Sequence, residues 1–274
     1  MSLRVVVLLT AAACLGPAAH AARQAGEPFR TGFNLFSKQQ DVELGQEAAQ
    51  EVRKKYKEVN SPFLQAYVRR IGERLAATPN AKASGFPFTF TVLENKQVNA
   101  FALPGGPIFI LSGLLQNVDT EGQLAAVMAH EMSHVILRHG THETSKAGLW
   151  NIPVMLAGAA TGKDSILTRL TAAGVNLPIM KFSRDAESEA DALGAHLMAD
   201  AGYDPTEMAQ FFNKLQSIGS QGNSKFAQIL SDHPNPGNRE RAIEEEARYI
   251  HGKNYGYRTG EFERAKEEVA RLPK

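Results

Sequence analysis

The chain has 274 residues, of which 43% are hydrophobic, so it is long enough for one ordinary domain with a buried core. Thirty lysines and arginines balance 29 aspartates and glutamates, and the net charge of +1 leaves none of the basic surface that nucleic-acid binders carry. The single cysteine, Cys14, excludes an intramolecular disulfide and a metal site built from several thiolates. Histidine and carboxylate side chains are therefore the expected ligands of any bound metal.

Residues 1–21 have the order of a secretory signal peptide. Arg4 precedes an apolar run from Val5 to Ala13 that is too short to span a bilayer, and small residues before Ala21 offer a cleavage site. We therefore expect an exported protein that resides in the periplasm or elsewhere in the cell envelope. A lipoprotein attached through Cys14 is the alternative, because three alanines directly precede that cysteine.

The rest of the chain, residues 22–274, is expected to form a single domain without a membrane-spanning segment, because it contains no run of 18 apolar residues. A capping-box pattern at Ser37 predicts an amphipathic helix that reaches about Val59. Ser61-Pro62 predicts the start of a second helix that continues through Ala77. The first third of the domain is therefore predicted to be helical.

Two strands are predicted next. Phenylalanine, threonine and valine alternate over residues 86–93, and a short apolar run over 107–111 follows two glycines. The strands are joined through residues 94–106 and indicate a small sheet. Together with the helices, this sheet places the chain in the α+β class.

Two longer helices follow the strands. Thr120 caps a helix that is predicted to run to about His139, and another is predicted from Arg184 to Ala201. Later helices are expected to start at Asp204-Pro205 and Asn235-Pro236, with a loop at 219–224 and a solvated, charge-mixed helical tail from Arg239.

The first of these helices carries the motif His130-Glu131-Met132-Ser133-His134. Four residues at 100° each bring the second imidazole to within about 40° of the first, so both can bind one ion. Glu131 points about 100° away and can reach a water beside the ion rather than the ion itself. The preceding turns are apolar, which buries the helix. The motif therefore predicts a metal-dependent hydrolase site.

A catalytic zinc site normally has three protein ligands, so a third is needed. The metzincin spacing is excluded, because Leu137 and Gly140 stand where that class has its glycine and third histidine. On a straight helix His139 and His142 are out of phase with the first pair, so we expect them to be exposed polar residues.

The second helix offers better candidates for the third ligand. Glu187 and Asp191 lie one turn apart on one face, whereas Glu189 does not share that face. A glutamate that binds the ion and an aspartate that orients a ligand imidazole would suit this spacing. A plain solvated acidic face is the alternative interpretation.

These segments together resemble metallopeptidase family 48, which includes HtpX and the CAAX prenyl proteases. The resemblance covers about residues 40–245 and rests on four segments: Asn99 to Gly106, Leu124 to His134, Arg184 to Asp191, and Asp232-His233-Pro234 with Arg239. The sequence differs from the membrane-embedded members of the family because we expect no spanning helices after the signal peptide. It differs from the larger periplasmic members because we expect no helical-repeat domain.

The resemblance implies a mostly helical, gluzincin-like zinc protease domain with one small β-sheet beside the active-site helix. By it, one Zn²⁺ per chain is held by His130, His134 and Glu187, and Glu131 is the general base. The implied function is a metalloendopeptidase acting on extended, unfolded or misassembled envelope proteins in protein quality control. The alternative is a zinc-containing holdase chaperone or binding module without proteolytic turnover.

Other residues receive roles with alternatives left open. His233 is expected either to occupy a fourth zinc position and hold the enzyme latent, which we favour, or to stabilise the oxyanion, with Arg239 as a neighbouring donor. Substrate binding is assigned to the strand region at Asn99, Ala100 and Phe101, although core packing is the favoured interpretation of the Phe101 side chain.

The apolar stretch 149–161 is too short to span a membrane as a helix. It is expected to be core, with a lid over the cleft or a peripheral membrane contact as alternatives. The expected partners are protein substrates and not nucleic acid, and the sequence leaves the oligomeric state open.

Overall fold

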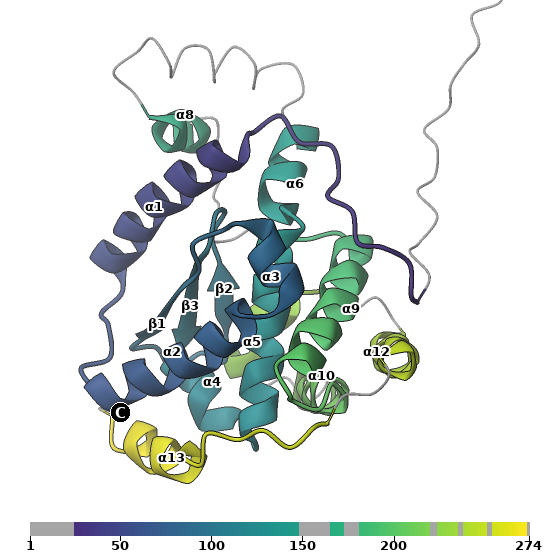
Figure 1. The fold of residues 1–274 in the computed structure, drawn as a ribbon. Helices are drawn as coiled ribbons and strands as arrows, with labels where there is room; N and C mark the ends of the chain where they lie inside the picture. The colour runs from purple at the N-terminus through teal and green to yellow at the C-terminus, as the bar shows by residue number, and fades with distance from the viewer. Residues whose placement is uncertain are drawn as a thin grey trace, which may run out of the picture.

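A computed structural model describes six segments of the chain, which are residues 25–147, 165–172, 181–219, 224–234, 238–250 and 254–272. The predicted signal peptide and the apolar stretch 149–161 lie outside these segments. The described chain is mostly helical with one small sheet, so the α+β prediction is confirmed. Helix α5 (Glu121–Ile136) is central, with the sheet on one side and helix α9 (Arg184–Asp200) on the other (Figure 1).

The two helices predicted in the first third are present as α1 (Lys38–Lys55) and α2 (Pro62–Ala76). The capping box of α1 is formed, because the Ser37 hydroxyl accepts from the Gln40 amide and the Gln40 side chain accepts from the Ser37 amide. Helix α1 ends earlier than predicted. The chain beyond it becomes extended, and the Val59 amide donates to the Val92 carbonyl.

The sheet contains the two predicted strands and a third. Strands β1 (Thr89–Leu93) and β3 (Pro107–Leu111) pair in parallel, and β2 (Ala100–Ala102), which the sequence pattern did not reveal, pairs antiparallel with β3. The strand order is β1-β3-β2, so β2 lies at the edge. Gly105 and Gly106, with φ of 76° and 128°, allow the tight turn that returns the chain from β2 to β3.

Each face of the sheet has its own core. One face packs against α1, where Leu44 and Ala48 meet Phe109 and Leu111. The opposite face joins α2 and α5 in the larger core, in which every residue of α5 from Glu121 to Val135 is buried. Removing this apolar surface from water is the main stabilising contribution to the fold.

The N-terminal end of α5 is fixed by polar contacts. The Thr120 hydroxyl caps the helix by accepting from the Gln123 amide. The buried carboxylate of Glu121 accepts hydrogen bonds from the hydroxyls of Tyr67 and Tyr203, at 3.2 and 3.3 Å, and from the amide of Thr259 at 2.8 Å. These contacts connect α5 to α2 and to the C-terminal segment.

Helix α5 does not reach His139 as predicted. It ends at Ile136, and Arg138 adopts a left-handed backbone with φ of 60°, after which helix α6 (His139–Ala147) begins in a new direction. A non-glycine residue rarely adopts this conformation. Arg138 is held there by an ion pair from its Nε to the Asp41 carboxylate at 2.6 Å.

The remaining elements surround this core. The predicted helix after Asp204-Pro205 is present, and the predicted tail helices are partly buried rather than only solvated, since Ile243 and Val269 are enclosed. The other helices are α3 (Pro79–Ser84), α4 (Ser112–Asn117), α8 (Ile166–Ala172), α10 (Thr206–Gly219), α11 (Ala227–Asp232), α12 (Arg239–Tyr249) and α13 (Phe262–Ala270), with a short 3₁₀ turn at Ser224–Phe226.

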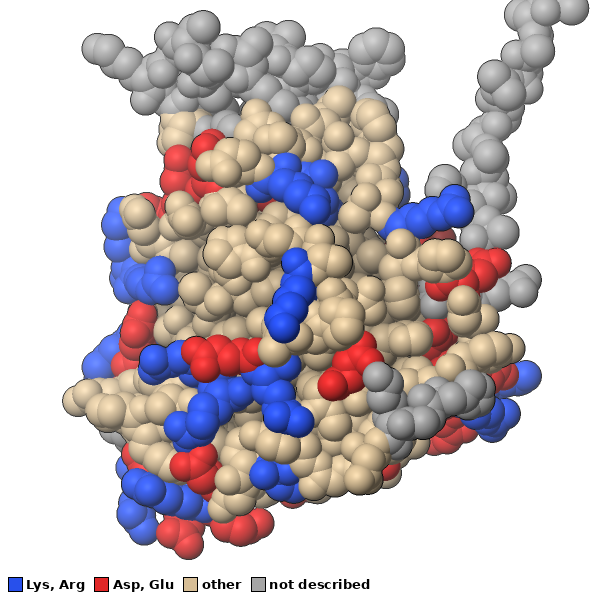
Figure 2. All heavy atoms as spheres, in the orientation of Figure 1, with Lys and Arg blue, Asp and Glu red and all other residues tan. Residues whose placement is uncertain are grey.

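Basic and acidic side chains are interspersed over the face drawn in Figure 2, as the balanced composition predicts. Within the six described segments, no helix has both the length and the apolar character needed to cross a membrane.

Gly45→Ala should destabilise the protein, although alanine normally favours a helix by about 1 kcal/mol. A Cβ at Gly45 would lie 1.7 Å from the carbonyl oxygen of Pro104, so α1 or the turn between β2 and β3 must move. We expect a net loss of about 1–3 kcal/mol, measured as a lower midpoint of thermal unfolding. Gly256→Ala is the matched control, since nothing lies within 4 Å of its Cβ. An unchanged midpoint in Gly45→Ala would contradict the close packing of α1 on this turn.

Candidate metal centre

Helix α5 presents the two histidines of the motif to one point. The ring nitrogens Nε2 of His130 and His134 lie 3.0 Å apart, and both side chains are buried. Four residues separate them, so they stand one turn apart on the same face. The spacing of the motif therefore places both imidazoles on one face of the helix.

Helix α9 brings a carboxylate to the same point. The two oxygens of Glu187 lie 3.4 Å from Nε2 of His130 and 3.4 Å from Nε2 of His134, and the side chain is fully buried. The helix starts with Ser183, whose hydroxyl accepts from the Ala186 amide. Packing of α9 along α5 then places Glu187 between the two imidazoles.

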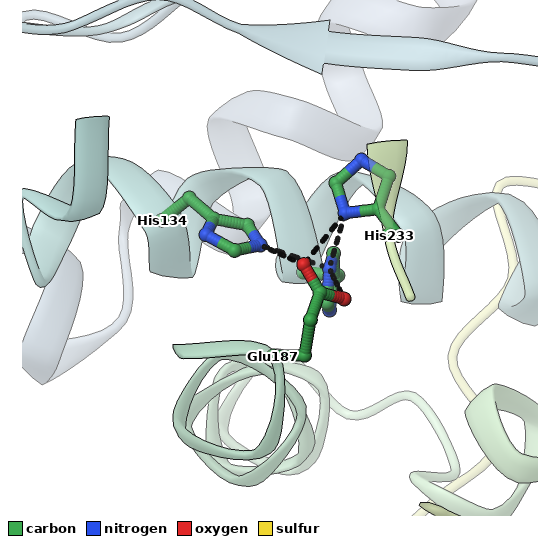
Figure 3. Close-up of side chains that lie close together, drawn as sticks. His134, Glu187 and His233 are labelled. Carbon is green, nitrogen blue, oxygen red and sulfur yellow. Dashed lines mark hydrogen bonds and ion pairs between the residues drawn. The ribbon is translucent and has the colours of Figure 1, made fainter. Parts of the chain in front are cut away.

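His233 approaches from a third element, at the C-terminal end of α11 (Figure 3). Its Nδ1 lies 3.0 Å from the Glu187 carboxylate and 3.2 Å from Nε2 of His130. One donor atom from each of His130, His134, Glu187 and His233 lies within 4.8 Å of the others. The chain thus brings together four predicted site residues from three helices.

These four groups fit a metal ion. A tetrahedral ion with bonds of about 2.0–2.1 Å holds its donor atoms about 3.3 Å apart. Five of the six pairs of groups lie 3.0–3.4 Å apart, and the donor atoms of all four lie within 4.8 Å of one another. The Nε2 atoms of His130 and His134 face each other at 3.0 Å, and a cation between them would satisfy the lone pair of each. Nitrogen and carboxylate oxygen are donors that zinc accepts.

The charges of the four groups are set by burial and by their contacts with one another, and a protonated His130 must lose its proton before it can bind a metal. Burial raises the pKa of Glu187, but His233 and His130 outweigh it and hold that pKa well below its usual range. Burial lowers the pKa of His134 well below its usual value. Burial also lowers the pKa of His130, but the Glu187 and Asp191 carboxylates raise it, with a net value of about 9. The cluster therefore favours an ionised Glu187, a neutral His134 and positive charge near His130.

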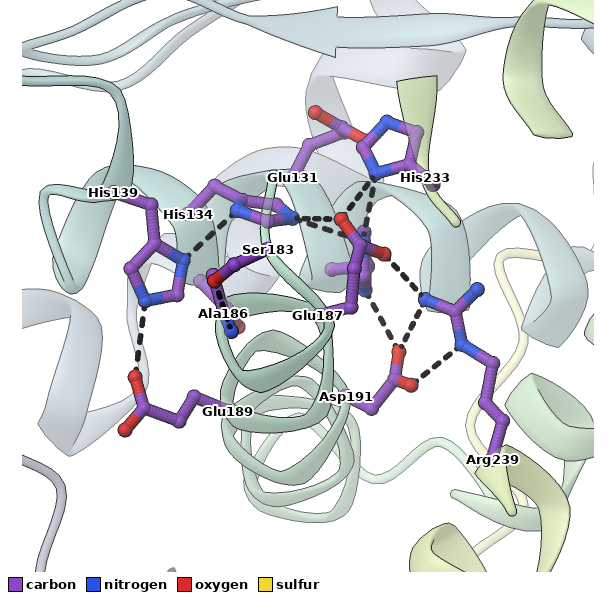
Figure 4. A network of polar contacts seen from close by, with 12 residues as sticks. Glu131, His134, His139, Ser183, Ala186, Glu187, Glu189, Asp191, His233 and Arg239 are labelled. Carbon is purple, nitrogen blue, oxygen red and sulfur yellow. Dashed lines mark hydrogen bonds and ion pairs between the residues drawn. The ribbon is translucent and has the colours of Figure 1, made fainter. Parts of the chain in front are cut away.

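Asp191 and Arg239 lie behind the donor atoms. Asp191 accepts from Nδ1 of His130 at 2.9 Å, which is the orienting contact that its spacing from Glu187 predicts. Arg239 donates to Glu187 at 2.9 Å and to Asp191 at 2.8 Å (Figure 4). Its guanidinium lies over the Phe212 ring. Its carboxylate contacts make Arg239 a partner that orients Glu187 and Asp191, and its role as an oxyanion donor stays a prediction.

Glu131 is buried beside the donor atoms and is not one of the four. Its carboxylate lies 3.3 Å from Nε2 of His233. Burial raises the pKa of Glu131, while His233, His130 and the backbone amide of Ala102 lower it, with a net rise. The residue therefore stands between the metal centre and the edge strand β2 with a raised proton affinity.

His139 is buried, which contradicts the expectation that it is an exposed polar residue. That expectation assumed a straight helix, and the left-handed turn at Arg138 redirects the chain so that Nδ1 of His139 lies 2.9 Å from Nδ1 of His134. His142 is half-buried and contacts the Phe33 carbonyl. No glycine or proline marks the turn, so the sequence offered no signal for it.

Phe182 is a further residue that sequence reasoning missed. Its ring stacks on the imidazole of His134 with 4.0 Å between centroids. It directly precedes Ser183, the cap of α9, but its contact is with α5 rather than with the helix that follows it. No pattern in the sequence indicated this contact.

The three predicted substrate residues lie in and beside β2, but two of their side chains are buried. Asn99 donates to Asp232 at 3.2 Å, and Ala100 is enclosed in the core. The half-buried Phe101 stacks on Phe109 with 5.2 Å between ring centroids, as the core interpretation predicts. The side chains of Asn99 and Ala100 are therefore not positioned to contact a substrate, which leaves the backbone of the edge strand as the accessible part.

Comparisons with known proteins identify the family of this chain. The profile of peptidase family M48 matches residues 62–247. Over 210 residues the chain is 31% identical to the Beta-barrel assembly-enhancing protease of Escherichia coli, which covers 73% of this chain and 42% of the relative. Over 220 residues it is 32% identical to the Mitochondrial metalloendopeptidase OMA1 of Schizosaccharomyces pombe, with 79% and 64% covered. The chain thus spans less than two thirds of the length of these curated relatives. The match over more than half of its residues shows that the chain belongs to peptidase family M48.

Proposed function

We propose that this chain is a zinc-dependent endopeptidase that hydrolyses peptide bonds in extended, unfolded or misassembled proteins of the cell envelope. The observation that carries the proposal is the position of Glu131, a buried carboxylate beside the metal centre that is not needed as a ligand. A zinc clamp in a holdase chaperone or binding module requires no such group. The printed names of the relatives, a protease and a metalloendopeptidase, support the same reaction.

The metal would be held by His130, His134 and Glu187, and zinc suits this set of two imidazoles and one carboxylate. When bound, zinc supplies a Lewis acid that polarises the peptide carbonyl and lowers the pKa of a nearby water. The donor residues are already gathered, so little rearrangement is required to bind the ion. Asp191 and Arg239 hold His130 and Glu187 in orientation.

Glu131 would act as the general base. It accepts a proton from the attacking water while the water oxygen bonds to the peptide carbonyl carbon. It then donates that proton to the amide nitrogen as the carbon–nitrogen bond breaks. Its raised pKa suits this exchange, because a carboxylate with ordinary acidity would retain the proton less readily.

The edge strand β2 would align the substrate. In the described part of the chain, β2 pairs only with β3, so its other edge offers backbone donors and acceptors. Ala102 of this strand lies close enough to Glu131 for its amide to stabilise the carboxylate. An extended peptide that adds beside β2 would pass the base, and backbone recognition of this kind implies loose sequence preference.

The envelope location rests on the predicted signal peptide. The name of the Escherichia coli relative, which refers to β-barrel assembly, points to the same compartment. Unfolded or misassembled proteins are the expected substrate class, because only extended chains can add to a strand edge.

His233 would keep the resting enzyme latent as a fourth ligand. Its Nδ1 lies among the donor atoms and its Nε2 lies 3.3 Å from Glu131, so it occupies the space in which a water would meet the base. Removal of this side chain would open that space without removing the other three donors.

Glu187→Gln should weaken zinc binding while the helices remain folded, because its contribution is negative charge at the ion. We expect a loss of at least about 10–100-fold in zinc affinity, measured by competition with a chromogenic chelator. Asp185→Asn, at an exposed site on the same helix, is the matched control. Wild-type zinc affinity in Glu187→Gln would refute the assignment and leave His233 as the third ligand.

Casein cleavage tests the reaction. Activity of the mature protein should disappear with a chelator and return with zinc, whereas Glu131→Gln should retain zinc and lose at least about 10²-fold in rate, because an amide cannot accept the proton. Absence of cleavage under every condition, also after replacement of His233, would favour the holdase alternative. Substantial activity in Glu131→Gln would mean that another group activates the water.

His233→Ala should raise basal casein cleavage severalfold and leave the zinc content at one ion per chain, because three ligands suffice. The measurement is the initial rate at saturating zinc, with metal content determined on the same sample. A fall of about 10²-fold would instead assign His233 to the oxyanion and end the latency proposal.

A further inference from the structure

The second ligand histidine is connected to a buried chain of polar contacts that the proposed reaction does not use. Nδ1 of His134 lies 2.9 Å from Nδ1 of His139, and Nε2 of His139 lies 3.2 Å from the carboxylate of Glu189 (Figure 4). His139 is buried, whereas the Glu189 side chain is 39% exposed. The chain therefore runs from the metal centre to the protein surface.

The position of the metal centre fixes the direction of each hydrogen bond. His134 directs Nε2 toward the other donor atoms, so its ring proton must reside on Nδ1. Nδ1 of His139 must then be the acceptor, which places the proton of that ring on Nε2. An ionised Glu189 carboxylate accepts hydrogen bonds and cannot donate them, so it completes the chain as the last acceptor. A single tautomer of each ring satisfies all the contacts.

His130 provides a comparison within the same site. Its Nδ1 contacts the Asp191 carboxylate directly at 2.9 Å. The corresponding nitrogen of His134 contacts His139 instead of a carboxylate. His139 in turn contacts Glu189 of α9, so it bridges His134 and that carboxylate. Both ligand rings are therefore linked to carboxylates of α9, one directly and one through a second imidazole.

The backbone is built to hold His139 in this place. The backbone of Arg138 is in the left-handed conformation, and its Nε forms an ion pair with the Asp41 carboxylate at 2.6 Å. A conformation that L-residues disfavour persists only where the surroundings fix it, and such residues are frequent at functional sites. The Phe182 ring covers His134 from one face. His134 is thus confined by a ring contact and by one hydrogen-bond partner.

We propose that His139 is a positioning residue that fixes the tautomer and the ring orientation of His134, with Glu189 as the terminal acceptor. This inference rests on the proposed zinc function of the centre. Partners of this kind typically contribute 10–100-fold to metal affinity or activity. His139 therefore supports zinc binding without contacting the ion or the substrate.

Zinc affinity of four proteins tests the proposal. His139→Leu fills the space but removes the acceptor, and should weaken zinc binding about 10–100-fold. His139→Asn places an amide oxygen near the Nδ1 position and should restore affinity to within a few-fold of the wild type. His142→Leu, a histidine on the same helix without contact to the centre, is the matched control and should bind zinc as the wild type does.

Histidine ring NMR of the zinc-loaded, ¹⁵N-labelled protein gives a readout that packing alone would not change. The wild type should show His134 protonated on Nδ1 with slow exchange, and His139 protonated on Nε2. The slow exchange should be lost in His139→Leu and kept in His139→Asn. The wild-type spectrum is decisive even where a variant fails to fold, since His139 protonated on Nδ1 would overturn the proposal.

The outcomes also separate this inference from the proposed function. Failure of the wild type to bind zinc would refute the metal centre itself. Tight zinc binding by the wild type with equal affinity in folded His139→Leu would refute only the role of His139. Equal losses in His139→Leu and His139→Asn, at equal folded fraction, would also refute it, because they would indicate packing rather than hydrogen bonding.

Discussion

Burial of two carboxylates between α5 and α9 is the constraint on which the site depends. Glu187 and Asp191 are almost without contact with water, and an isolated charge in that position would be strongly unfavourable. Arg239 and the imidazole of His130 compensate them. Because the carboxylates and their two partners come from three different helices, the tertiary arrangement and the charge balance of the metal centre require one another.

The local part of the site could be predicted from the sequence. His130 and His134, like Glu187 and Asp191, are separated by four residues, and helical geometry alone aligns such pairs. The Thr120 cap indicated where the first helix starts, and the second helix was correctly predicted to start at Arg184. Roles that depend on a single helix could therefore be predicted from local patterns. The contact of Glu187 with the two histidines could be predicted only from the family resemblance.

Features that tertiary contacts create could not be predicted from the sequence. Strand β2 has only three residues, too few for a period to be recognised, and it exists because β3 supplies its partners. The end of α5 depends on the ion pair between Arg138 and Asp41, which lie 97 residues apart. The burial of His139 follows from that turn. Local sequence patterns thus failed at positions whose conformation depends on contacts between residues far apart in the chain.

Helix α5 is enclosed on all sides, so it has no solvent-facing stripe to define its rotation about its own axis. Apolar side chains of similar volume pack with little preference among such rotations. Polar groups discriminate far more strongly, because a buried one that loses its partner is costly. Glu121 at the N-terminal end and His130 in the second half of the helix each have fixed partners on neighbouring elements. The angular setting of the helix is therefore specified by a few hydrogen bonds at these two positions, while its apolar residues supply most of the burial energy.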